Sequence, residues 1–143
     1  MILSRFSFGP GIKRLNHDPA NYKTIVLVGP VWMGSLIAPL RDFLKKYKNS
    51  INRLFFVCCC GSSDVKKEDK FGHAHVFEKV RELTGSRIVH CEAFPIGLVL
   101  SEEEQENSEM IMNTRLSNDN FSGEIQERFD KLVPKILNIE SVS

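Results

Sequence analysis

The sequence lacks any apolar run long enough to cross a membrane. A membrane-spanning helix needs about 20 consecutive, mostly apolar residues, and no stretch of these 143 residues approaches that length. The opening segment, MILSRF, is too short and too polar for a secretory signal peptide. We therefore expect a cytoplasmic protein with no membrane partner.

The chain also lacks an excess of charge of either sign. Its 19 basic and 18 acidic residues give a formal net charge of +1. Proteins that bind nucleic acid or anionic membranes through electrostatics carry a basic surplus or a basic cluster. The balance therefore argues against nucleic acid as a partner.

Cysteine is sparse, and three of the four cysteines are consecutive. Cys58, Cys59 and Cys60 fall on a predicted strand, so neighbouring side chains alternate between its two faces and cannot converge on one metal. Free cysteine packs as a small hydrophobe. We interpret these residues as reduced core thiols rather than as a redox or metal site, and Cys91 on a later strand does not alter that.

Histidines are few and scattered along the chain, at His17, His73, His75 and His90. Two of them lie two positions apart on a predicted helix, a spacing that does not place them on one face. No Ser/His/Asp or Cys/His arrangement is evident, so the sequence gives little support for hydrolase chemistry, and no catalytic or metal-binding residue is assigned.

The length and the hydrophobic content of 42% fit one globular domain over residues 1–143. Residues 1–22 are expected to be irregular or briefly helical, and the polar segment 101–122 to be a loop insertion with a short helix. Outside these two segments, hydrophobic periodicity predicts three strands and three helices in alternation. The strands are predicted at 23–29, 53–60 and 87–94, and the helices at 36–47, 73–84 and 123–138. This order indicates a parallel α/β sheet with right-handed crossovers.

The strongest functional signal follows the first strand, where an apolar run ends in GPVWMGS. Ligands of open parallel sheets bind at the carboxyl ends of the strands, so Trp32 would lie where a flat cofactor binds. The second strand ends in Gly61-Ser62-Ser63, and both strand ends would face one crevice. Simpler interpretations stay open: a half-buried Trp32 that covers the strand end or a subunit interface, and Ser35 as a helix N-cap.

These motifs together resemble the flavodoxin-like family of small FMN proteins and flavin reductases. The resemblance rests on GPVW-M-G, the following SLIAPLRDFLKKY helix and the second strand ending in Cys-Gly-Ser-Ser. It covers roughly residues 21–100, with a weaker match over 123–137. It implies a three-layer flavodoxin-like parallel sheet with FMN as the cofactor. The residues expected against the flavin are Pro30, Val31, Trp32, Met33, Gly34, Ser35, Cys60, Gly61 and Ser62.

One part of the family pattern is missing. Its members open with a strand and a Thr/Ser/Gly/Asn-rich turn that wraps the FMN phosphate, and residues 1–22 contain no such turn. The fold is therefore expected to be N-terminally incomplete, with an open edge on the 23–29 strand. Either the chain is a fragment of a longer protein, or it forms a homo-oligomer that covers this edge.

The resulting hypothesis is an FMN-binding redox protein, acting in electron transfer or flavin-dependent reduction with impaired phosphate binding. A redox partner protein or NAD(P)H would supply the electrons. The alternative is a flavin-free α/β interaction module.

Overall fold

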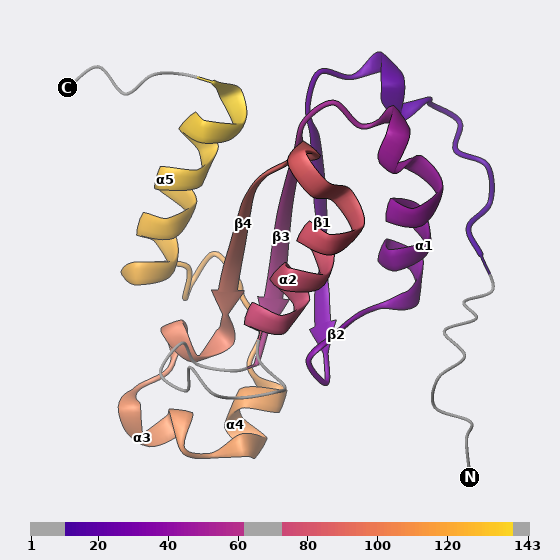
Figure 1. The fold of residues 1–143 in the computed structure, drawn as a ribbon. Coiled ribbons are helices and arrows are strands. Elements are labelled where there is room, and N and C mark those ends of the chain that lie inside the picture. Colours follow the sequence, from indigo (N-terminus) through magenta and orange to yellow (C-terminus); the bar gives the residue numbers. More distant parts are fainter. Residues whose placement is uncertain (1–10, 62–72, 139–143) are drawn as a thin grey trace, which may run out of the picture.

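The computed structural model describes residues 11–61 and 73–138, which form an α/β fold around a four-stranded sheet (Figure 1). The strands are β1 (Ile25–Trp32), β2 (Ser35–Leu36), β3 (Leu54–Cys60) and β4 (Ile88–Pro95). Their order in the sheet is β2-β1-β3-β4, with β1, β3 and β4 parallel and β2 antiparallel to β1. The α/β class is confirmed, as is a parallel core of three strands. The short β2 was not predicted.

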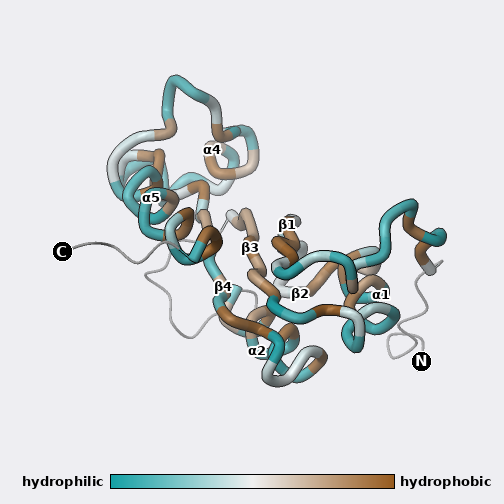
Figure 2. The backbone as a smooth tube through the Cα atoms, turned by 90° about the horizontal axis from the view of Figure 1, so that it is seen from above, coloured by the Kyte–Doolittle hydropathy of each residue, from teal (hydrophilic) through white to brown (hydrophobic). Residues whose placement is uncertain are grey.

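Helices lie on both faces of this sheet. They are α1 (Ala38–Tyr47), α2 (His73–Thr84), α3 (Glu102–Gln105), α4 (Ser108–Asn113) and α5 (Glu124–Leu137). Figures 1 and 2 show α1 and α2 on one face and α5 on the other. The short α3 and α4 occupy the segment expected to be a loop with one short helix. None of the helices in the described ranges has the length and apolar character needed to cross a membrane.

The central strand β3 explains why the sheet is stable between two helical layers. Its side chains are buried on both faces except for Cys59, as is typical of parallel strands covered on both sides. Toward α1 and α2, the buried cluster includes Leu54, Phe56, Cys58, Leu44, Val76 and Val80. Toward α5, the buried cluster consists of Phe55, Val57, Phe94, Ile125 and Leu132.

Polar contacts fix α5 over β4. Arg128 donates a hydrogen bond of 3.2 Å from Nη1 to the carbonyl of Ala93, and its Nη2 lies 2.7 Å from Glu124 Oε1. The same guanidinium is 4.0 Å from Glu92, whose Oε2 contacts His90 Nε2 at 3.1 Å. These contacts hold α5 over the β4 side of the sheet, away from β1.

Strand β1 is therefore covered on one face only. Its residues alternate between half-buried and exposed, with Ile25 and Leu27 packed toward α1 and α2. On the other face Val26, Val28 and Trp32 are exposed, and Figure 2 shows no helix over this face of β1. The apolar run was interpreted as a buried strand, and this is wrong for half of its side chains because α5 covers only β3 and β4.

Candidate functional site

The segment after β1 is a tight hairpin rather than the start of a helix. Trp32 pairs with Ser35 across a two-residue turn. The turn residues Met33 and Gly34 have positive φ angles of 48° and 66°, as the type I′ hairpin turn requires. Glycine adopts such angles without strain, whereas Met33 does so at a conformational cost.

This hairpin corrects the role predicted for Ser35. Helix α1 begins at Ala38, and Ile37 stands at its N-cap position without a side-chain hydrogen bond to the helix. Ser35 belongs to β2 and does not cap the helix. Pro39 near the helix start supplies the favourable backbone angle instead. Strand β2 has only two residues and therefore no periodicity of its own by which the sequence could predict it.

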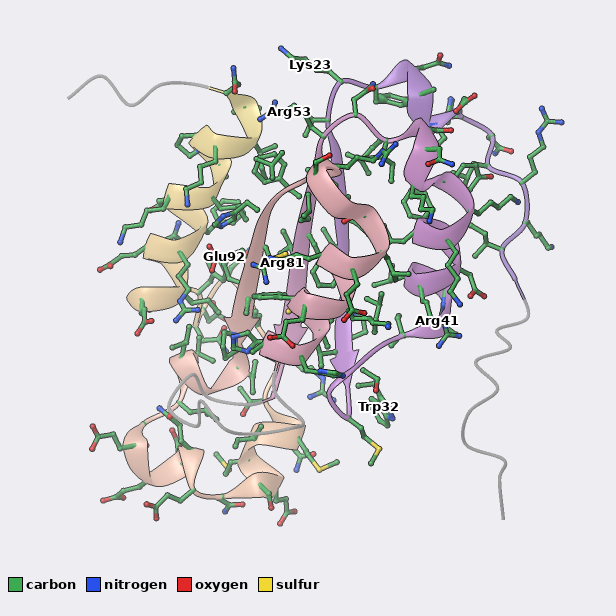
Figure 3. All side chains as sticks on the ribbon, viewed as in Figure 1. Lys23, Trp32, Arg41, Arg53, Arg81 and Glu92 are labelled. Atoms are coloured by element: carbon green, nitrogen blue, oxygen red, sulfur yellow. The ribbon has the colours of Figure 1, made fainter. Side chains whose placement is uncertain are left out.

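The two strand ends expected to share a crevice are neighbours. Strands β1 and β3 are parallel and in register as far as Pro30 opposite Cys59, which places Trp32 beside the carboxyl end of β3 at Gly61. Trp32 is 69% exposed and lies at the hairpin end of β1 (Figure 3). Val31 points back toward the core beneath it. Ser62 lies outside the described residues.

The three consecutive cysteines differ in burial. Cys58 and Cys60 are buried in the core toward α1 and α2, whereas Cys59 is exposed. The expectation of alternating faces holds, but Cys59 is not a core thiol because its face is the one that α5 leaves open beside β1. A hydrogen bond with Cys60, together with burial, raises the pKa of the Cys58 thiol well above its ordinary value. Cys58 is therefore a neutral thiol at physiological pH.

The fold also brings a thiol and an imidazole into contact, which the sequence did not predict. Cys60 Sγ lies 3.7 Å from His73 Nδ1, across the connection from the end of β3 to the start of α2. The ring of His73 in turn packs at 5.2 Å, centroid to centroid, from Phe77. Thirteen positions separate the thiol and the imidazole in sequence, so their contact depends on the start of α2 lying beside the end of β3.

A small pocket lies behind the hairpin, between β2, α1 and α2. Its volume is about 160 Å³, and its lining combines two of the predicted site residues with three basic side chains that were not predicted. The lining residues are Gly34, Ser35, Leu36, Arg41, His75, Val76 and Lys79. A larger hollow of about 490 Å³ lies at the opposite end of α1, around Asp18 and Tyr47, far from the carboxyl ends of the strands.

Two further observations describe the chemical groups at this end of the sheet. Among residues 11–61 and 73–138, no three His, Cys, Asp or Glu side chains are placed to hold a metal ion. The aromatic residue, the glycine turns and the basic pocket lie together at the carboxyl end of the sheet.

Comparison with protein-family models, curated proteins and solved structures finds no match to this chain.

Proposed function

We propose that this chain is a flavodoxin-like domain that binds FMN at the carboxyl edge of its sheet and acts in electron transfer or flavin-dependent reduction. The observation that supports this is the exposure of Trp32 at that edge, 69% of its surface. A large aromatic side chain is costly to leave in water and favours a stacked partner. The carboxyl end of a parallel sheet is where such folds bind ligands.

The residues fit the ring of the cofactor better than its phosphate. The pocket of about 160 Å³ is too small for a flavin, because pockets for ligands of that size measure about 300 Å³ or more. The ring would therefore lie on the surface against Trp32, within reach of the backbone at Gly34 and Gly61. The flavin would supply the redox chemistry, and the protein would position it. A redox partner protein or NAD(P)H would provide the electrons.

The sole tryptophan makes the test specific. Trp32 is the only tryptophan in the chain, so quenching of protein fluorescence on titration with FMN reports on this site alone. Trp32→Ala should weaken FMN binding, followed by flavin fluorescence, by on the order of 1 kcal/mol, and Trp32→Phe should retain most of the affinity. Met112→Ala is a matched control, since Met112 is 71% exposed on α4. Equal FMN affinity in Trp32→Ala and the native protein would exclude the stacking role.

A second candidate function is association of two copies through β1, and the open face of that strand favours it. Val26, Val28 and Trp32 form an uncharged, exposed row. In the described ranges, the outer edge of β1 is paired by β2 only at Val31 and Trp32. Exposed apolar edge strands tend to pair with another chain, and an uncharged row can face its own copy without repulsion between like charges.

Light scattering tests this candidate directly. A dimer is expected, and Cys59 should become protected from thiol reagents as the protein concentration rises, because Cys59 is exposed opposite Pro30 on the same side of the sheet. A monomer at all concentrations, with Cys59 equally reactive throughout, would rule out association through this face.

A further inference from the structure

We propose that the pocket behind the β1–β2 hairpin is a binding site for a phosphate-sized oxyanion, a proposal that does not rest on flavin binding. The pocket is lined by the guanidinium side chain of Arg41, the ammonium side chain of Lys79 and the imidazole side chain of His75. Among residues 11–61 and 73–138, no carboxylate lines this pocket. Three nitrogen-bearing side chains from two helices thus converge on one small cavity.

The size of the cavity selects the class of ligand. Its volume of about 160 Å³ is several times the roughly 30 Å³ that one water occupies in the liquid. It is also about half the lower limit of roughly 300 Å³ typical of pockets for larger ligands. A tetrahedral anion such as phosphate, or the phosphate group of a small ester, fits this range.

In the described part of the chain, each basic group has an acidic neighbour that does not line the pocket, and that of His75 is Glu78 at 4.0 Å from Nδ1. Glu82 accepts a hydrogen bond of 2.9 Å from Lys79 Nζ, and Asp42 lies 3.7 Å from Arg41 Nε. Neither carboxylate lines the pocket. An ammonium group can donate three hydrogen bonds, so Lys79 can hold Glu82 and an anion at once. The planar guanidinium of Arg41 matches two oxygens of a phosphate.

Helices α1 and α2 bring these groups to one place, where the side chains of His75 and Lys79 are 65% and 48% exposed. Arg41 sits in the first turn of α1, and its side chain is 18% exposed. His75 and Lys79 are four positions apart on α2 and therefore share one face of that helix. Val76 between them is buried in the core, which fixes the rotation of α2. Gly34 and Ser35 of the hairpin line the pocket on the β2 side, and the pocket is open to solvent.

The test is thermal unfolding in inorganic phosphate, compared with sodium chloride at equal ionic strength. Phosphate also stabilises proteins by exclusion from their surface, so the comparison that matters is between variants. Lys79→Gln is paired with Lys131→Gln, because Lys131 is also a helical lysine beside a glutamate, at 3.9 Å from Glu127 on α5. Saturable binding should raise the melting temperature as the phosphate concentration passes the dissociation constant.

We expect the saturable rise in the native protein and in Lys131→Gln. Lys79→Gln should show at least about tenfold weaker apparent affinity, the scale of one lost charge-assisted hydrogen bond. Arg41→Gln should show a similar loss. Glycerol phosphate in place of inorganic phosphate distinguishes the sources: tighter binding of the ester indicates a phosphorylated metabolite, and tighter binding of inorganic phosphate indicates the free ion. Equal phosphate responses in Lys79→Gln and Lys131→Gln would overturn the proposal.

Discussion

The close packing of β1 on α1 gives a sharp test of the fold. A methyl group added at Gly29 would overlap Leu40 Cδ1 and lie 3.3 Å from Leu40 Cγ. Overpacking a core typically costs about 1–3 kcal/mol, and replacing Gly by Ala returns about 0.4–1 kcal/mol through the unfolded chain. Leu40 is only half-buried and can shift, which places the net cost of Gly29→Ala near the lower end, about 1 kcal/mol.

Thermal unfolding followed by circular dichroism measures this cost. For a chain of this size, about 1 kcal/mol corresponds to a fall in melting temperature of about 2–4 °C. The decisive comparison is Gly29→Ala in a Leu40→Ala background, where the overlapping atoms are gone. There the added methyl group should be neutral or stabilising, because the effects of two substitutions on stability are not additive when the residues are in contact. If Gly29→Ala destabilises both backgrounds equally, β1 does not pack on α1 at this point.

Three further predictions concern the thiols and α5. Native protein should react with one equivalent of thiol reagent rapidly at the exposed Cys59, and Cys58, fully buried, only on unfolding, as mass spectrometry of labelled peptides would show. The fold raises the pKa of the Cys58 thiol and so favours its neutral form. The unfolded chain loses this proton above about pH 8.5, so the stability that this group contributes is present below that pH and declines above it. Cys58→Ala should reduce this alkaline decline in the free energy of unfolding, measured with denaturant. Arg128→Ala should cost about 1 kcal/mol through its lost bond to Ala93, whereas Lys131→Ala, 75% exposed, should cost nothing measurable.

The regular elements could be predicted from the sequence because their signals are local. The strand predicted at 53–60 is apolar from Leu54 onward, and the structure forms β3 over Leu54–Cys60 and buries all of it except Cys59. The helix predicted at 73–84 matches α2 at both ends. Pro134 lies inside the last helix, and α5 nevertheless continues to Leu137, where Asn138 in the left-handed conformation ends it. The apolar stripe of α5 packs against the sheet, and this packing outweighs the hydrogen bond that proline removes.

The site was less predictable because its parts come from separate segments. Trp32 and Gly34 were predicted to follow a strand ending at residue 29, whereas β1 continues to Trp32 and Gly34 lies in the hairpin turn after it. The basic pocket was not predicted, because Arg41 and Lys79 lie on different helices and no local pattern links them. Only the packing of α1 beside α2 brings them together. The exposure of Cys59 likewise depends on how much of the sheet α5 covers, which no local sequence pattern predicts.

One variant separates association from flavin binding. Val28 is 58% exposed on the open face of β1, so Val28→Lys should change the stability of a monomer by no more than about 0.5 kcal/mol. Two copies facing each other through β1 would bring two added lysines into one apolar interface, and the dimer should dissociate. Trp32 lies four residues further along the strand, about 13 Å away, so FMN should quench its fluorescence as in the native protein. Retention of the dimer in Val28→Lys would place the interface elsewhere, and loss of FMN quenching with the dimer would show that the flavin site needs both copies.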